Sequence, residues 1–304
     1  MSETADRDAY LIDASMYVFR AWHSIPPDLH DADGQPVNAV HGFTRFLLEL
    51  LERRKPRHVV VAFDAALESS FRNELYPPYK ANRDPAPDAL KRQFAHCAAL
   101  CAALGLTVLV DGRYEADDLI GTALRVLRER GLRGVIVSAD KDMSQLLHGD
   151  DEQWDYARDQ HWNAAGVKAR YGVHAHQIAD YLGLCGDSVD NIPGIPGIGA
   201  KTAATLLGHF GSLDALLTRH AEVAYLRLRG AAMHAQRLHD HRDLALLCRQ
   251  LATIATDAPL PAGFADGRRQ PHDESALNGL LDHLRVGPMT RRRIAAIQWN
   301  AVRE

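Results

Sequence analysis

The chain has 304 residues, of which 46% are hydrophobic and 24% charged, and its formal net charge at pH 7 is −4. This composition is typical of a globular protein, and the length favours one large α/β domain with a smaller second one. No apolar run is long enough to cross a membrane, and the acidic, polar start does not resemble a signal peptide, so we expect a cytoplasmic protein.

The first quarter of the chain contains two apolar runs that each end in an acidic residue. Residues 10–12 lead into Asp13, and residues 59–63 lead into Asp64. Between them, residues 40–54 carry apolar side chains at helical spacing and stop just before a proline. This order predicts a strand, a helix and a second strand of a parallel sheet, with both acids at strand ends.

The segment between Asp64 and residue 89 has a different composition, with little apolar periodicity. It interleaves basic and aromatic side chains, namely Phe71, Arg72, Tyr76, Tyr79, Lys80 and Arg83. A plain surface loop is one interpretation. The other is a nucleic-acid contact, because basic groups neutralise phosphates while aromatic rings stack on bases or sugars.

The next part of the chain repeats the order of helix and strand. Residues 89–104 and 117–130 are predicted helices, each followed by a glycine that suits a helix end. Residues 106–110 and 135–139 are predicted strands. Acidic residues follow both strands: Glu115, Asp117 and Asp118 after the first, and Asp140 and Asp142 after the second.

These acids are expected to lie close together, because the carboxyl ends of parallel strands meet at one edge of a sheet. Taken singly, each could be a helix cap or a turn residue. As a group they repel, by about 4 kcal/mol for two carboxylates about 4 Å apart at an effective dielectric constant near 20, unless cations or protons are present. Oxygen-only ligands favour Mg²⁺ or Mn²⁺, so the pattern predicts metal-assisted phosphoryl chemistry.

From residue 175 the pattern is helical, and we place a domain boundary there. Residues 182–207 predict two helices joined by a glycine-rich hairpin. Exposed backbone amides and the following helix N-terminus suit a phosphate, although a tight helix–helix turn is the simpler alternative. The hairpin region contains two further acids and five candidate phosphate contacts: Asp187 and Asp190, then Gly194, Gly197, Gly199, Lys201 and Thr202.

The remaining reactive residues form no recognisable motif. The four cysteines show no CxxC spacing, so a disulfide or a cysteine zinc site is not expected. The sixteen histidines are scattered, and we expect surface or helix-face positions for nearly all of them. The negative net charge does not exclude a nucleic-acid partner, because the clustered acids account for more than all of it.

Together, these stretches resemble the 5′ nuclease or flap endonuclease superfamily, especially the 5′→3′ exonuclease domain of bacterial DNA polymerase I. The resemblance extends to about Asp257. It rests on an ordered set of motifs: residues 11–13, 62–64, 71–75, 79–80, 115–121, 140–143 and 186–199. Residues 65–70 depart from the basic, glycine-bearing start of the family's helical arch, and Ala139 replaces a common glycine.

The resemblance implies an α/β fold with a parallel-sheet nuclease core of the PIN-like 5′ nuclease type and a helical helix-hairpin-helix subdomain. The core would span residues 1–175, with the arch around residues 66–90. A helical DNA-binding region would span residues 176–304, with its hairpin at about residues 182–207.

The resemblance also implies roles for single residues. Two Mg²⁺ ions, for which Mn²⁺ could substitute, would be held by nine acids: Asp13, Asp64, Glu115, Asp117, Asp118, Asp140, Asp142, Asp187 and Asp190. The catalytic cations would be Lys80 and Arg72. DNA contacts would come from Arg20, Tyr79, Arg83, Gly194, Gly197, Gly199, Lys201 and Thr202, and the hairpin of this family can hold K⁺.

The function that the resemblance implies is two-metal hydrolysis of DNA by a structure-specific 5′ nuclease, in primer or flap removal and repair. The substrates would be DNA with 5′ flaps or ends, including RNA-primed DNA. We expect a monomer working at the bacterial nucleoid, with any polymerase partner on a separate chain. A non-catalytic DNA-junction-binding paralogue is the alternative.

Overall fold

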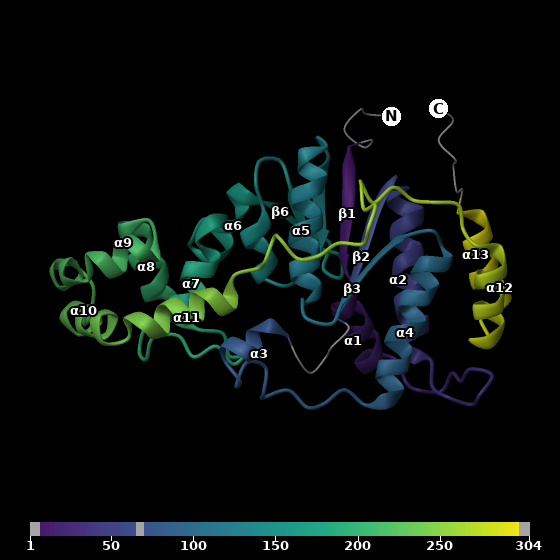
Figure 1. Ribbon diagram of the computed structural model, residues 1–304, viewed down its shortest axis with the longest axis horizontal. Coiled ribbons are helices and arrows are strands. Elements are labelled where there is room, and N and C mark those ends of the chain that lie inside the picture. The colour runs from purple at the N-terminus through teal and green to yellow at the C-terminus, as the bar shows by residue number, and fades with distance from the viewer. Residues whose placement is uncertain (1–6, 65–69, 298–304) are drawn as a thin grey trace. The chain divides into compact units, whose positions relative to one another are not determined.

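The computed structural model describes residues 7–64 and 70–297 (Figure 1). The chain forms two compact units. The first comprises residues 1–68, 85–138 and 255–304, and the second comprises residues 69–84 and 139–254. Neither unit is continuous along the chain, and the division at residue 175 stays a prediction. In the described ranges, no helix has the length and apolar character needed to cross a membrane.

The first unit is built on a parallel sheet with the strand order β3-β2-β1-β4. In the register of β1 and β2, Asp13 lies opposite Ala62, and in that of β2 and β3, Asp64 lies opposite Asp111. The β-branched residues of β2 are fully buried, as expected for a sheet covered on both faces. The predicted parallel α/β core is therefore confirmed. The four strands are β1 (Asp8–Asp13), β2 (His58–Asp64), β3 (Thr107–Asp111) and β4 (Arg133–Val137).

Helices cover both faces of this sheet. Helix α5 packs on one face, while α2 and α4 cover the other (Figure 1). Helix α12 packs against α4, and α13 packs against α2. The helices of this unit are α1 (Ala14–Ser24), α2 (Asn38–Arg54), α4 (Asp88–Ala103), α5 (Ala116–Glu129), α12 (Glu274–His283) and α13 (Pro288–Ala296).

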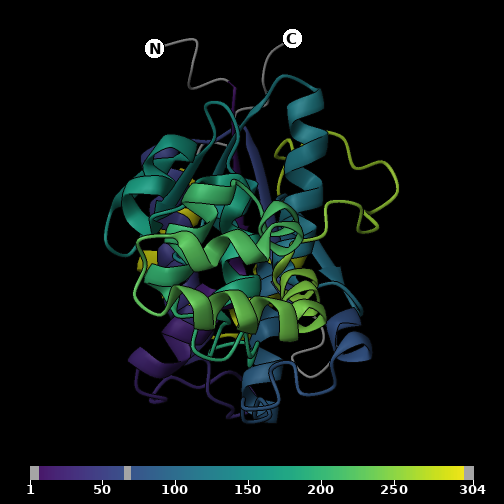
Figure 2. The same cartoon turned by 90° about the vertical axis from the view of Figure 1, so that its left-hand side faces the viewer.

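The second unit is mostly helical (Figure 1, and in green in Figure 2). Helix α7 packs against both α8 and α11. Its helices are α3 (Phe71–Leu75), α6 (Ala164–Tyr171), α7 (Ile178–Cys185), α8 (Ala200–Phe210), α9 (Leu213–Thr218), α10 (Ala231–Asp240) and α11 (Arg242–Ala252). Three 3₁₀ helices accompany them: η2 (Asp142–Leu146), η3 (Ala175–Gln177) and η4 (His220–Tyr225).

The second unit also contains an antiparallel hairpin that the sequence pattern did not predict. Strands β5 (Glu152–Asp155) and β6 (Gln160–Asn163) pair from Glu152 opposite Asn163 to Asp155 opposite Gln160. The strands are short and mostly polar, so they give no apolar run. Trp154 and Trp162 are both buried, and they lie on opposite faces of the hairpin because Trp154 is opposite His161 and Trp162 is opposite Gln153. The predicted start of the arch, residues 65–69, lies outside the described residues.

Two helices of the first unit end in the same way, and this allows a matched test of packing. Gly105 after α4 and Gly131 after α5 have φ values of +71° and +76°. At both helix ends, the residue that follows the glycine donates its backbone N–H to the carbonyl of the residue five positions earlier. A Cβ on Gly105 would lie 2.1 Å from the carbonyl oxygen of Gln270, whereas one on Gly131 would meet no atom within 4 Å.

We therefore expect Gly131→Ala to lower the free energy of unfolding by about 1–2 kcal/mol, the cost of a left-handed backbone. Gly105→Ala should cost about 1–3 kcal/mol more, because the segment around Gln270 must move. Chemical denaturation of both variants measures the difference. Equal losses would show that the Gln270 segment does not pack against this helix end in solution.

Candidate functional site

Two of the predicted metal ligands end neighbouring strands of the first unit. Asp13 ends β1 and caps α1, and its Oδ1 accepts a hydrogen bond from the backbone N–H of Met16 at 3.2 Å. Its Oδ2 accepts from the Ser138 hydroxyl at 3.0 Å. Asp64 ends β2, and its Oδ1 accepts from the N–H of Ala116 at 2.8 Å. The sheet therefore brings both carboxylates to its carboxyl edge, where backbone and hydroxyl donors offset their charge.

Three further acids lie at the beginning of α5, on both sides of the point where the helix starts. Glu115 is the N-cap residue, and Asp117 and Asp118 lie in the first turn. Asp118 is fully buried, and its two oxygens accept from the N–H groups of Glu115 at 3.1 Å and Ala255 at 2.8 Å. Asp118 thus positions Glu115, while the partial positive charge of the helix N-terminus favours the whole trio.

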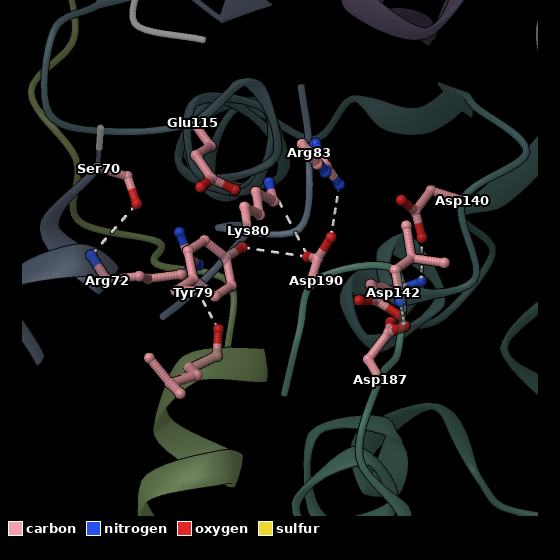
Figure 3. Close-up of polar contacts among 12 residues, drawn as sticks. Ser70, Arg72, Tyr79, Lys80, Arg83, Glu115, Asp140, Asp142, Asp187 and Asp190 are labelled. Carbon is pink, nitrogen blue, oxygen red and sulfur yellow. Dashed lines mark hydrogen bonds and ion pairs between the residues drawn. The ribbon is translucent and has the colours of Figure 1, made fainter. Parts of the chain in front are cut away.

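Four predicted ligands belong to the second unit, and two of them share one ammonium group. Lys141 Nζ lies 2.5 Å from Asp187 Oδ2 and 3.3 Å from Asp142 Oδ1. Asp140 Oδ1 accepts from the N–H of Asp142 at 2.9 Å, which fixes the turn before η2. Figure 3 shows Asp140, Asp142 and Asp187 gathered in this region. The sequence showed a lysine between two acids but gave no reason to assign it a role.

The electrostatics of this group fit a divalent cation. Asp142 is 7% exposed, and among the described residues none donates a hydrogen bond to its buried Oδ1. Burial and then the Asp140 carboxylate raise the pKa of Asp142 to about 8, against the opposing effect of Lys141. Burial alone would lower the pKa of Lys141, but Asp142 and Asp187 raise it well above its ordinary value. Two carboxylates are held together here with one cation already between them.

The fourth acid of the second unit, Asp190, contacts three side chains of the basic segment, which we define as residues 71–83. Arg83 donates to its Oδ1 at 2.6 Å and the Tyr79 hydroxyl to its Oδ2 at 3.1 Å, while Lys80 Nζ lies 3.9 Å from Oδ2 (Figure 3). The backbone N–H of Lys80 also donates to the carbonyl of Asp190 at 3.0 Å. Three of the predicted DNA or catalytic side chains therefore converge on one carboxylate.

Arg72 lies in a different environment from the other basic residues of this segment. It is 3% exposed, and its guanidinium donates to the carbonyls of Leu251 at 2.8 Å and Thr253 at 2.9 Å. The arginine therefore satisfies the carbonyls at the end of α11. Its catalytic role stays a prediction and would require Arg72 to leave these partners. Arg20 is exposed on α1.

The predicted hairpin lies between α7 and α8. Gly194 and Gly197 have φ values of +64° and +76°, and Gly199 is the N-cap residue of α8. A Cβ on Gly194 would lie 2.3 Å from the backbone nitrogen of Gly186, so the close turn excludes a side chain there. Lys201 is exposed in the first turn of α8, next to Thr202. This arrangement leaves the helix N-terminus open to an anion.

One residue of the hairpin region could not be found from the sequence. Arg237 of α10 donates a hydrogen bond to the carbonyl of Gly197 at 3.2 Å. It is 40 residues away from its partner, and its position follows an ordinary helical pattern. A guanidinium therefore lies against the carbonyl face of the hairpin.

Comparison with known proteins matches nearly the whole chain to two consecutive family descriptions. Residues 8–172 match "5′-3′ exonuclease, N-terminal resolvase-like domain", and residues 173–275 match "5′-3′ exonuclease, C-terminal SAM fold". DNA polymerase I of Rhizobium leguminosarum is 36% identical over 299 residues, covering 96% of this chain and 29% of the relative. DNA polymerase I of Pseudomonas aeruginosa is 41% identical over 251 residues, covering 82% of this chain and 27% of the relative.

A solved structure confirms the fold at low sequence identity. The flap endonuclease of bacteriophage T5, in a complex with DNA and metal ions, has a TM-score of 0.64 and 18% identity. The match covers 96% of this chain and 98% of the phage protein. The predicted combination of an α/β nuclease-type core with a helical second region is therefore confirmed at the level of the fold.

The raised pKa of Asp142 gives a stability prediction for the metal-free protein. The folded-state pKa of about 8 lies above the ordinary value of 3.8, so the folded protein binds more protons between these pH values. Its free energy of unfolding should fall as the pH rises through this window. In EDTA, we expect Asp142→Asn to lose less stability than the wild type between pH 5 and pH 8, by an amount on the order of a few kcal/mol.

Urea denaturation at the two pH values provides the measurement. The matched control is Asp84→Asn, which removes an exposed carboxylate of the same unit. If Asp142→Asn and the wild type show the same loss between pH 5 and pH 8, Asp142 is ionised without penalty and the proposed charge balance is wrong.

Proposed function

The chain belongs to the 5′-3′ exonuclease family, and on that premise we propose that it is a structure-specific 5′ nuclease that hydrolyses phosphodiester bonds in DNA. The observation that carries the proposal is the set of carboxylates at the sheet edge of the first unit and around Lys141 in the second. Because the chain spans only 29% of its relative in Rhizobium leguminosarum, the activity is proposed for this chain and not transferred from the longer protein.

We propose that the acids hold two Mg²⁺ ions, for which Mn²⁺ could substitute. The ligands in the first unit would be Asp13, Asp64, Glu115 and Asp117, with Asp118 holding Glu115 in place. Those in the second unit would be Asp140, Asp142, Asp187 and Asp190. When bound, such ions supply an activated water and stabilise the charge on the leaving oxygen. The buried Oδ1 of Asp142, whose printed contact among the described residues is the Lys141 ammonium, supports this assignment.

Basic side chains of residues 71–83 would bind the substrate by leaving Asp190 for a phosphate group. Lys80 and Arg83 are paired with Asp190, and Lys80 lies too far from it for a hydrogen bond. A phosphate of the substrate offers these cations a second anion, while a cation at Asp190 would release them. We propose that Lys80 then stabilises the charge that develops on the scissile phosphate, and that Tyr79 and Arg83 orient the strand.

The hairpin would hold duplex DNA through its phosphates. The first-turn N–H groups of α8, which no side chain caps, and the ammonium of Lys201 would supply a partial and a full positive charge. The carbonyl of Gly197 already accepts from Arg237, so K⁺ could use this carbonyl only if Arg237 moved away. DNA with 5′ flaps or ends is the proposed substrate, with RNA-primed DNA as a variant and the monomer as the active form.

Cleavage of a 5′-labelled flap duplex tests the nuclease activity. With Mg²⁺, we expect the wild type to cut near the junction, and Asp140→Ala to be at least about 10²-fold slower because a preorganised charge is lost. Duplex binding by Asp140→Ala, measured by fluorescence anisotropy, should be retained. Asp84→Asn is the matched control and should cut at the wild-type rate.

Tight binding by the wild type without cleavage, in Mg²⁺ and in Mn²⁺, would contradict the proposal. It would favour the alternative, a non-catalytic protein that binds DNA junctions. An Asp140→Ala variant as active as the wild type would contradict the assigned ligands without excluding a nuclease.

The proposed role of the hairpin leads to a separate prediction about duplex binding. We expect Lys201→Ala to weaken binding to duplexes of any sequence and to reduce the slope of log K against log salt by about 1, because one phosphate contact is lost. Lys168→Ala, which removes an exposed lysine from the last turn of α6, is the control. An unchanged salt slope for Lys201→Ala would show that the hairpin does not contact phosphates.

A further inference from the structure

Asp31, His96 and His283 form a second cluster of metal-ligand side chains, and all three belong to the first unit. Asp31 lies in the loop after α1, His96 lies on α4, and His283 is the last residue of α12. One ligand atom from each residue lies within 4.8 Å of the other two. We propose that these three side chains bind a divalent transition-metal ion of the Zn²⁺ class.

The cluster contains two buried ligand atoms that have no hydrogen-bond partner. Asp31 is 1% exposed, and its Oδ1 accepts from the N–H groups of Asp33 at 3.0 Å and Gln35 at 2.8 Å. Within the described ranges, neither Asp31 Oδ2 nor His96 Nε2 has such a bond. A buried carboxylate oxygen without a hydrogen bond is costly. A cation held by Asp31 and His96 would offset that cost.

The spacing of Asp31 and His283 is that of an ion pair when His283 is protonated, and it is also close to the spacing of two zinc ligands. Asp31 Oδ2 lies 3.7 Å from His283 Nε2, which is too long for a hydrogen bond. Ligand atoms around one tetrahedral Zn²⁺, with bonds of about 2.0–2.1 Å, are about 3.3 Å apart. The three side chains, with ligand atoms within 4.8 Å of one another, would have to move inward to close the site.

The donor set determines the class of metal. Two imidazoles and one carboxylate suit Zn²⁺ and similar transition metals, whereas Mg²⁺ prefers oxygen ligands only. Three protein ligands leave the fourth position of a tetrahedral ion to a water molecule. The site thus differs in chemistry from the carboxylate clusters of the proposed nuclease.

Two hydrogen bonds near the cluster connect the segments that carry its ligands to neighbouring elements. The N–H of Ala32 donates to the carbonyl of His283 at 2.7 Å, which ties the Asp31 loop to the end of α12. Buried Gln93 accepts from the N–H of Ala39 at 2.7 Å, which ties α4 to the start of α2. Figure 1 shows α12 beside α4. A bound ion would link α12 to α4, which is one of the helices that cover the sheet.

Two charged neighbours act on the cluster in opposite directions. The Arg92 guanidinium donates to Gln35 Oε1 at 2.9 Å, close enough to act electrostatically on His96, and Asp33 acts on His96 with the opposite sign. The repulsion between Arg92 and a bound cation is thereby partly offset. The site should bind Zn²⁺ less tightly than one without a neighbouring arginine.

Zn²⁺ titration of the metal-free, full-length protein tests the proposal, with excess Mg²⁺ present to occupy the nuclease acids. We expect the wild type to bind one equivalent that His283→Gln and His96→Gln bind at least about 10-fold more weakly. Zn²⁺ should raise the melting temperature of the wild type and not that of the two variants. His148→Gln, which removes an exposed histidine, is the control and should behave as the wild type.

Co²⁺ provides a readout that does not depend on stability. Its visible absorption should show tetrahedral coordination in the wild type and in His148→Gln, and lose that band in His283→Gln. Equal Zn²⁺ stoichiometry and affinity for the wild type, His96→Gln and His283→Gln would overturn the proposal. The cluster would then be only a solvent-shielded interaction between Asp31 and His283.

Discussion

The cost of holding several carboxylates close together is the constraint on which the functional part of this protein depends. In the second unit, Lys141 lies between Asp142 and Asp187, while Arg83 and Lys80 face Asp190. In the first unit the compensation comes from neutral donors, as in the N–H groups that serve Asp118. The acids named here thus have local partners that offset their negative charge.

These two kinds of charge compensation differ in how easily the partner of the acid can move away. Backbone N–H groups cannot be displaced without unfolding the helix start, so the acids they hold are fixed in place. The ammonium of Lys141 sits on a flexible stem and can turn away when a divalent cation arrives. The same reasoning applies to Arg83 and Lys80, which on the proposed function would exchange Asp190 for a phosphate of the substrate. The ion pairs of the free protein would then be the ones that substrate binding replaces.

The sequence could predict the features that depend on local periodicity. Apolar runs that end in acids predicted the strands before Asp13 and Asp64, and glycine spacing predicted the hairpin before α8. It could not predict contacts between distant residues of ordinary type. Arg72 belongs to a basic, aromatic segment, yet its guanidinium serves carbonyls about 180 residues away. The same limit hid Arg237 and the cluster of Asp31, His96 and His283, which no spacing rule connects.

On the proposed function, Lys141 occupies the place of a cation that the acids of the second unit would bind. Anomalous X-ray diffraction from crystals of the protein soaked with Mn²⁺ tests this. We expect an anomalous peak beside Asp142 and Asp187, with the Lys141 ammonium turned away from both carboxylates. A crystal that takes up Mn²⁺ elsewhere while Lys141 keeps its contacts with Asp142 and Asp187 would contradict it.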